Sequence, residues 1–404
     1  MNIISGGVTA AKGFKAGGLC CGIRANKTKP DLAMIVSDTL CTAAAVYTKN
    51  LVKGAPIAIT KKNIANGHAQ AVICNSGNAN TCNADGEEKA WRMCEIAGEA
   101  LGIDPADVVV GSTGVIGQVL PIEPIEKGAP LLAKELTYDG SSKANLAIMT
   151  TDTVEKNYAV SVTVGGKEVS IGGIAKGSGM IHPNMATMLG FITTDAAISA
   201  ELLQKALSAS IEKTFNMVSV DGDTSTNDMV CVLANGCAGN EEIVAEGEDY
   251  AAFKDALELV CKEICKMIAG DGEGATKLLV CKVSGAKDEL TARVAAKSVI
   301  CSSLLKAAMF GADANWGRVL CALGYSGADI DVHKVDVSFI SKAGRVDVCK
   351  MGAGIPFSEE VAKVVLTEKD IDIVIELHDG EGYAEAYGCD LTYDYVKING
   401  DYRT

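Results

Sequence analysis

Apolar and polar positions in part of the first half of the chain follow the two-residue period of β-strands. Residues 158–164 and 169–174 alternate in this way on either side of Gly165–Gly166, which predicts a β-hairpin. Glycine-rich stretches separate further short apolar runs. The strands expected from these runs are 32–38, 41–50, 71–74, 108–111 and one that ends in hydroxyl residues at 148–153.

Helical spacing becomes prominent in the second half. Apolar residues recur every three or four positions over 198–215 and 249–269, which predicts two long amphipathic helices. An earlier helix is predicted over 87–102, since its pattern ends at Gly102. Strands are expected at 188–192, 229–234, 278–284, 335–340 and 371–377. Because helices and strands mix without a strict β-α-β repeat, the pattern predicts an α+β fold with packed sheets.

Composition and charge favour small-molecule chemistry in the cytoplasm. The chain has 404 residues, 48% of them hydrophobic but only 5% aromatic, so its core must be mostly aliphatic. A net charge of −14 disfavours nucleic acid and anionic membranes as partners. No apolar run is long enough for a membrane span, and no secretory signal is evident at the start.

The fifteen cysteines are odd in number, scattered, and contain no CxxC pair. This usage indicates free thiols that serve as small core residues in a reducing compartment, without a disulfide framework or a metal site. Residues 221–228 resemble the start of a calcium loop, but Thr226 replaces the required glycine and Val232 the closing glutamate. We therefore expect this segment to form turns and caps, and we expect no metal.

Thr187 is the most informative candidate for chemistry. It follows Ala186 in a run rich in glycine, proline and asparagine, and an apolar stretch follows it. Its hydroxyl could attack the small Ala186 carbonyl and cut the chain, which would leave an N-terminal threonine. The freed α-amine, with a pKa of about 7.7–8, would then act as the base for the hydroxyl. A threonine at the start of a core strand fits the local composition as well.

Four further residues carry groups that suit acyl transfer. Thr113 and Gly114 follow a predicted strand and could offer two donors to an oxyanion, or form an ordinary turn. Lys176 is the only lysine or arginine between Lys167 and Lys205; its ammonium could hold a carboxylate, or lie on the surface. Glu273 lies between two glycines and could bind an ammonium, and its surroundings lack the spacing of a phosphate loop.

His182 lies close to Thr187 in the sequence and is a tempting general base. An N-terminal threonine already carries its own base in the α-amine, so no histidine is required. We therefore expect a structural or peripheral role for His182.

Residues 176–189, KGSGMIHPNMATML, resemble the processing and catalytic motif of the ornithine acetyltransferases, the bifunctional glutamate N-acetyltransferases of the cyclic arginine pathway. Other segments are similar to landmarks of that family and occur in the family order. They are GGVTAAKGF at 6–14, NSGNAN at 75–80, GSTGVIG at 111–117, IMTTDT at 148–153, NMVSVDGDTSTNDMV at 216–230, GEGATK at 272–277, GADANWGR at 311–318 and the terminal NGDYRT. The resemblance thus covers essentially the whole chain.

The resemblance implies a layered αββα sandwich of the self-processing, N-terminal-nucleophile type. Cleavage between Ala186 and Thr187 would give an α chain of residues 1–186 and a β chain of residues 187–404. Thr187 would be the nucleophile, and Thr113 with Gly114 the oxyanion hole. The substrate-binding residues implied by the family are Thr150, Lys176, Thr187, Glu273, Asn399 and Thr404.

The implied reaction moves an acetyl group from N-acetyl-L-ornithine to L-glutamate by a ping-pong route through acetyl-Thr187, without a cofactor, in an α2β2 heterotetramer. One alternative is a form that also accepts acetyl-CoA as co-substrate. A second is a self-cleaving amidase or aminopeptidase, which would pass the acyl group to water. A third is a binding module without enzymatic activity, in which Thr187 is only a core residue.

Overall fold

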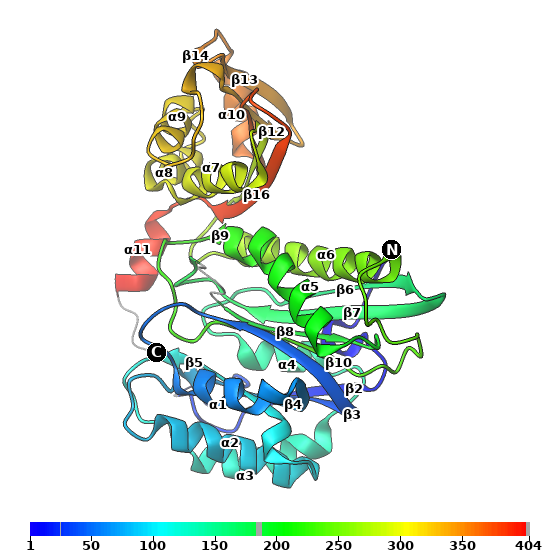
Figure 1. Cartoon of the computed structure of the whole chain (residues 1–404). Coiled ribbons are helices and arrows are strands. Elements are labelled where there is room, and N and C mark those ends of the chain that lie inside the picture. The colour runs from blue at the N-terminus through cyan, green and yellow to red at the C-terminus, as the bar shows by residue number, and fades with distance from the viewer. Residues whose placement is uncertain (25, 183–187, 401–404) are drawn as a thin grey trace.

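The computed structural model describes residues 1–24, 26–182 and 188–400. Over these residues the chain forms two β-sheets with helices packed on them (Figure 1). The larger sheet contains, in spatial order, β1 (Asn2–Ile4), β6 (Lys156–Val164), β7 (Lys167–Lys176), β8 (Leu189–Thr194), β10 (Met229–Ala234), β3 (Leu32–Tyr47), β4 (His68–Asn78) and β5 (Val108–Val115), while β2 (Phe14–Leu19) pairs with β3.

The smaller sheet lies in a second lobe, at the top of Figure 1. Its spatial order is β14 (Ala353–Gly354), β13 (Gly344–Lys350), β12 (Asp336–Ser341), β15 (Asp370–Glu376), β11 (Leu278–Ala286), β16 (Gly382–Cys389) and β9 (Val218–Ser219). The helices are α1 (Ala55–Asn63), α2 (Gly86–Leu101), α3 (Glu123–Glu135), α4 (Ser141–Ile148), α5 (Ala200–Lys213), α6 (Glu248–Gly270), α7 (Glu289–Cys301), α8 (Ser303–Phe310), α9 (Trp316–Gly324), α10 (Glu359–Thr367) and α11 (Tyr393–Gly400).

The long strand β3 turns the larger sheet into a sandwich. Its first part, Leu32–Val36, pairs with β4, and its last part, Thr42–Tyr47, pairs with β10, with a register shift between Val36 and Cys41. The two parts of the sheet therefore face each other across a shared apolar core that includes Ile35, Val72 and Phe191. A side chain added at Gly111 of β5 would lie 3.4 Å from Phe191 of β8, which shows how closely the layers approach.

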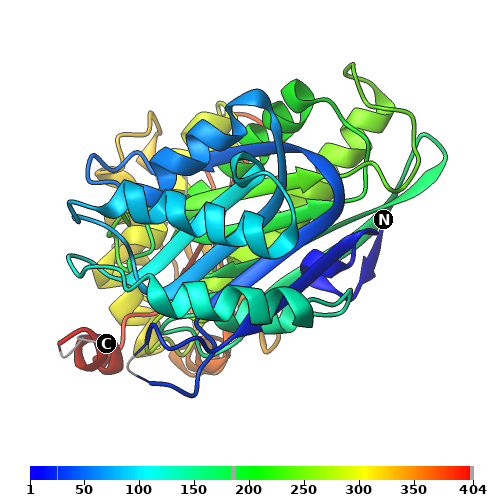
Figure 2. The ribbon, with the colours of Figure 1, turned by 90° about the horizontal axis from the view of Figure 1, so that it is seen from below.

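Helices cover both outer faces of this sandwich (Figures 1 and 2). α5 and α6 pack on the layer of β6, β7, β8 and β10, where Leu203 and Ile264 belong to the same core as Ile192. α1, α2 and α3 pack on the other layer, with Met93 and Ile125 against Ile73. The layer order is α, β, β, α. The predicted α+β fold and its αββα arrangement are confirmed.

The larger sheet contains strands from both sides of residues 186–187. β8, which follows the predicted cleavage site, lies between β7 and β10, and β10 pairs with β3. The Ala186–Thr187 bond itself is outside the described residues. The sheet is nevertheless one folding unit, since its hydrogen bonds join residues before 186 to residues after 187.

Most of the predicted elements are present, and two predictions are wrong. The hairpin is β6–β7 around Gly165–Gly166, and the two long helices are α5 and α6. Residues 32–38 and 41–50 do not form two strands, because the single strand β3 runs through most of them. Residues 148–153 do not end a strand: the helix α4 ends at Ile148 and an irregular loop follows, because α4 is held by packing against β2 and β3 rather than by strand pairing.

All fifteen cysteines are free thiols, and most are buried in the cores, as predicted. Burial raises the pKa of Cys74 to about 12, which keeps its thiol protonated and unreactive at neutral pH. Among the helices of the described residues, none combines the length and apolarity needed to cross a membrane.

Candidate active site

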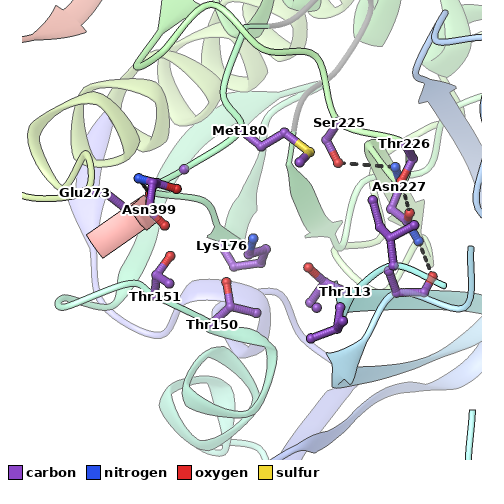
Figure 3. A pocket seen from close by; sticks show the side chains of 15 residues that line it. Thr113, Thr150, Thr151, Lys176, Met180, Ser225, Thr226, Asn227, Glu273 and Asn399 are labelled. Atoms are coloured by element: carbon purple, nitrogen blue, oxygen red, sulfur yellow. Dashed lines mark hydrogen bonds between the residues drawn. The ribbon is translucent and has the colours of Figure 1, made fainter. Parts of the chain in front are cut away.

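A cavity of about 300 Å³ opens where several chain segments end together (Figure 3). β5 contributes Thr113 and Gly114, and β7 contributes its last residue, Lys176. The remaining walls come from the loop after α4, the segment after Gly177, the loop before β10, the turn after α6, and α11. The residues that line it are Ala79, Thr113, Gly114, Val115, Ile116, Thr150, Thr151, Lys176, Gly179, Met180, Ser225, Thr226, Asn227, Glu273 and Asn399.

Lys176 supplies a buried cation to this cavity. Its side chain points into the cavity (Figure 3), and the residue is only 8% exposed. Among the described residues, its ammonium has no hydrogen-bond or salt-bridge partner within reach, although the charge of Asp152 is close by. A buried ammonium in this state is ready to bind an anionic group of a ligand, because such a group would replace its lost hydration.

Asp152 balances the charge of Lys176 from behind the cavity wall. Burial raises the pKa of the Asp152 carboxyl, but the nearby Lys176 and Lys156 lower it more, to about 2. Asp152 also accepts hydrogen bonds from the backbone of Thr150 at 2.9 Å and of Gly177 at 2.6 Å. The carboxylate therefore fixes the backbone on two sides of the site.

Two threonine hydroxyls and a glycine form the wall beside Lys176. The hydroxyls of Thr113 and Thr150 make no hydrogen bond within the described residues, so they are available to a ligand. Gly114 has a φ of +132°, and a Cβ on it would lie 2.3 Å from the carbonyl carbon of Gly77. Only glycine fits there, which explains why a Thr-Gly pair lies near the end of this strand.

Glu273 supplies the anionic end of the cavity. It is 9% exposed, and the side-chain amide of Asn399 donates a hydrogen bond of 2.7 Å to its Oε2. Its backbone N–H donates to the carbonyl of Ser178 at 2.9 Å. Gly179 makes room for the carboxylate, because a Cβ at residue 179 would lie 2.4 Å from it. The cavity thus presents a cation and an anion, together with free hydroxyls.

Comparison with known proteins shows the family to which this chain belongs. The model of the ArgJ family matches residues 15–404. The arginine biosynthesis bifunctional protein ArgJ 1 of Clostridium acetobutylicum is 52% identical over 98% of this chain and 97% of its own length. The corresponding ArgJ protein of Symbiobacterium thermophilum is also 52% identical and is covered, like this chain, over its full length. The chain belongs to the ArgJ family.

Two solved structures are also similar to this chain. The arginine biosynthesis bifunctional protein argJ from Bacillus halodurans has 49% sequence identity and a TM-score of 0.51; the match covers 54% of this chain and 100% of that one. The ornithine acetyltransferase from Mycobacterium tuberculosis, solved in complex with ornithine, has 34% identity and a TM-score of 0.42. That match covers 46% of this chain and 98% of the other.

The structure of this ArgJ-family chain brings together Thr113, Gly114, Thr150, Lys176 and Glu273, with Asn399 at the edge. Ala186, Thr187 and Thr404 are outside the described residues. Beyond the gap, Met188 is buried and β8 begins at Leu189, whose register partner on β7 is Lys176. The chain therefore re-enters the larger sheet directly beside the cavity.

The segment 221–228 contributes more to the site than the sequence predicted. Instead of forming only turns and caps, it places Ser225, Thr226 and Asn227 in the cavity wall (Figure 3). The amide of Asn227 donates to the carbonyls of Ala79 at 2.5 Å and Ser112 at 3.0 Å, which ties this wall to β5. The density of polar residues in a family landmark was the available signal. Thr151 and Met180 were missed as well, although both lie within landmark segments, 148–153 and 176–189.

His182 lies outside this cavity, as predicted. It lines a different groove, where its Nδ1 is 3.1 Å from Ser219 Oγ and 3.5 Å from Cys301 Sγ. Burial and the charge of Lys297 lower the pKa of His182 to about 4, so its ring is neutral at neutral pH. Within the described residues, no group of three or more histidine, cysteine, aspartate or glutamate side chains is arranged to hold a metal ion.

Proposed function

We propose that this ArgJ-family chain transfers the acetyl group of N-acetyl-L-ornithine to L-glutamate in arginine biosynthesis. The observation that carries the proposal is Lys176: a buried cation without a partner among the described residues, facing Glu273 across one cavity. An amino acid has both an α-carboxylate and a nitrogen at its α-carbon, and these two groups suit a cavity with one cation and one anion. The names of the 52% identical relatives place them in arginine biosynthesis.

The nucleophile is the hydroxyl of Thr187. Cleavage of the Ala186–Thr187 bond makes Thr187 an N-terminal residue with a free α-amine. The hydroxyl attacks the Ala186 carbonyl, the acyl group moves from nitrogen to oxygen, and water hydrolyses the resulting ester. The α-amine that this releases has a pKa of about 7.7–8 and deprotonates the neighbouring hydroxyl. No histidine takes part, which agrees with the position of His182 in another groove.

Acetyl transfer then follows in two steps. The Thr187 hydroxyl attacks the acetyl carbonyl of N-acetylornithine, the hydroxyl of Thr113 and the backbone of Gly114 stabilise the oxyanion, and ornithine leaves with the proton. The amine of glutamate next attacks the acetyl-Thr187 ester and regenerates the free hydroxyl. Because the first product leaves before the second substrate reacts, the kinetics are ping-pong.

Substrate binding depends on what ornithine and glutamate share. Lys176 binds the common α-carboxylate, and Thr150, Glu273, Asn399 and the C-terminal Thr404 contribute the remaining contacts. The side chain of ornithine is a cation and that of glutamate an anion. The cavity therefore binds the shared part and must tolerate side chains of either charge.

The coverage of a solved relative supports cleavage at this position. The B. halodurans chain is covered completely yet corresponds to only 54% of this chain. Residues 187–404 make up the same share of the 404 residues. The pairing of β8 with β7 and of β10 with β3 would hold residues 1–186 and 187–404 together after the cut. Assembly as an α2β2 heterotetramer in the cytoplasm, without a cofactor, completes the proposal.

Acetyl-CoA is a second acetyl donor in this proposal, because the relatives are named as bifunctional proteins. Formation of N-acetylglutamate from acetyl-CoA and glutamate, with no N-acetylornithine present, would establish it. Release of free acetate at a rate independent of glutamate would instead point to a self-cleaving amidase.

Intact-mass analysis of the purified protein tests the main proposal. We expect two fragments that meet between residues 186 and 187, and incubation with N-acetylornithine should add one acetyl group to the fragment that begins at Thr187. Thr187→Ala should abolish both the cut and the turnover, whereas Thr187→Ser should keep both at a lower rate. Activity of an uncut wild-type chain, or normal cleavage of Thr187→Ala, would contradict the proposal.

A further inference from the structure

A fully buried lysine lies behind the cavity without lining it. Lys156, the first residue of β6, is 0% exposed. Its Nζ is 2.7 Å from Asp152 Oδ1 and 2.5 Å from Asp271 Oδ2, and both of these carboxylates are buried as well. A third contact joins Nζ to the carbonyl of Val154 at 3.2 Å. Burial of such charges costs desolvation free energy, which the ion pairs offset only if their geometry is well fixed.

Each carboxylate of the cluster also holds the backbone of a segment that reaches the cavity. Asp152 accepts from the N–H of Thr150 and of Gly177, the residue that follows Lys176. Asp271 accepts from the N–H of Thr153 at 3.0 Å and from the Thr153 hydroxyl. Asp271 stands at the end of α6, two residues before Glu273. Three segments that are far apart in the sequence therefore meet at one ammonium group.

Two carboxylates and two ammonium groups interact in this region. Asp152 and Asp271 carry two negative charges; Lys156 neutralises one of them, and Lys176 supplies the second positive charge from the cavity side. Loss of the Lys156 charge would leave two buried carboxylates to repel each other and to attract Lys176 away from its ligand. The position of the Lys176 ammonium is thus coupled to Lys156.

We propose that Lys156 is a positioning residue, whose ammonium joins the 150–154 loop, the end of β7 and the turn after α6 so that Thr150, Lys176 and Glu273 face one substrate. The inference rests on the proposed function in so far as these three residues bind the substrates. Lys156 itself does not line the cavity, and its effect is exerted through Asp152 and Asp271.

Two variants and a matched control test this role. Lys156→Met keeps the length of the side chain and removes the charge, and Asp271→Asn keeps the shape and weakens one of the two ion pairs. Lys277→Met is the control, because Lys277 is similarly buried, lies beside Asp390 and bonds to the Met309 carbonyl, neither of which lines the cavity. Each protein is measured for cleavage, for KM and kcat with N-acetylornithine and glutamate, and for hydrogen–deuterium exchange.

In Lys156→Met and Asp271→Asn we expect KM for both substrates to rise about tenfold or more, since misplaced binding groups weaken substrate binding, with a smaller fall in kcat. Hydrogen–deuterium exchange should become faster in peptides that cover residues 149–154 and 176–179. Lys277→Met should change neither readout. If Lys156→Met does not fold, Asp271→Asn decides alone.

Unchanged KM and unchanged exchange in a folded Asp271→Asn or Lys156→Met protein would overturn the proposal, and so would equal changes in the control. A wild-type chain that fails to transfer acetyl would refute the proposed function but not this inference, because the exchange measurement reports the position of the loops without any turnover.

Discussion

The absence of a side chain at Gly179 determines where the Glu273 carboxylate lies. The Glu273 carboxylate occupies the space in which a side chain at residue 179 would start, 2.4 Å from the position of a Cβ. The backbone of Gly179 has no unusual φ, so an alanine there meets no backbone strain. The conflict involves only the movable end of the Glu273 side chain. The glycine is thus required for the position of the carboxylate rather than for the fold.

We therefore predict that Gly179→Ala displaces the Glu273 carboxylate and breaks its hydrogen bond to Asn399. Loss of a hydrogen bond to a charged group costs about 1.5–3 kcal/mol, which corresponds to a rise in KM of roughly ten- to a hundredfold. Steady-state kinetics with both substrates would measure the rise, and thermal unfolding should shift by only a few degrees. A normal KM would show that the carboxylate does not take part in binding.

At the scale of elements, the contact between β4 and β5 fixes the Thr113–Gly114 pair. The two strands run parallel, with Gly77 opposite Gly114, and both glycines have positive φ. The close approach leaves no room for a side chain at residue 114. Correct placement of the Thr113 hydroxyl therefore depends on a strand contact and not only on the residue itself.

Gly114→Ala should disturb this strand end and the oxyanion donors together. We expect a loss of stability of about 2 kcal/mol or more from strain and overpacking, and a fall in kcat of about a hundredfold. Gly117→Ala is a matched control, because Gly117 also has a positive φ of 79° but no atom lies within 4 Å of its added Cβ. Denaturant unfolding and kcat should change much less in the control; equal effects would refute the steric explanation.

The helix α11 is attached to the site by few contacts. None of its residues is buried, and its links to the body include the bond from Asn399 to Glu273, the edge contact of Tyr393 with Phe310, a side-chain hydrogen bond between Tyr395 and Asp221, and the bond from nearby Thr392 to the Gly274 carbonyl. An element with so few contacts adds little to global stability. Its contribution is Asn399, which lines the cavity.

Deletion of residues 399–404 should thus damage turnover far more than folding. We expect a nearly unchanged unfolding temperature, since neither Asn399 nor Gly400 is buried, and a rise in KM of at least about tenfold from the loss of the Asn399 contact. Asn399→Ala alone should reproduce part of the effect. Full activity of the truncated chain would remove the C-terminal residues from the site.

At the scale of the whole molecule, buried charges make stability depend on pH. The pKa of Asp152 is lowered to about 2: burial raises it, but Lys176 and Lys156 lower it more. Its unfolded value is about 3.9. A group with a lowered folded pKa contributes its full stabilisation above the unfolded pKa and loses it as the pH falls through the folded pKa. The stabilisation by Asp152 is thus complete at neutral pH and fades below about pH 4.

We predict that the difference in unfolding free energy between wild type and Asp152→Asn shrinks by about 1 kcal/mol between about pH 6 and about pH 3. Urea unfolding at a series of pH values would measure it. Asp255→Asn, at a mostly exposed side chain, should show no such change relative to wild type. A difference that stays constant with pH would mean that Asp152 is not ionised in the way that the structure implies.

The sequence by itself determined the elements whose signal is local. The β6–β7 hairpin follows from alternation around two glycines, and α5 and α6 follow from helical spacing, because these periods are properties of neighbouring residues. The family landmarks also identified Thr113, Gly114, Lys176 and Glu273, which the structure brings to one cavity.

Only the tertiary structure decided how distant segments meet. Because β3 pairs with β4 through its first part and with β10 through its last part, one sheet forms two layers. The helix α4 lies where a strand was expected near residue 148. Lys156 entered no prediction, because its cluster is completed by Asp271, which comes from a distant part of the chain. Contacts between distant residues depend on the whole packing, and so a chain's short-range pattern cannot specify them.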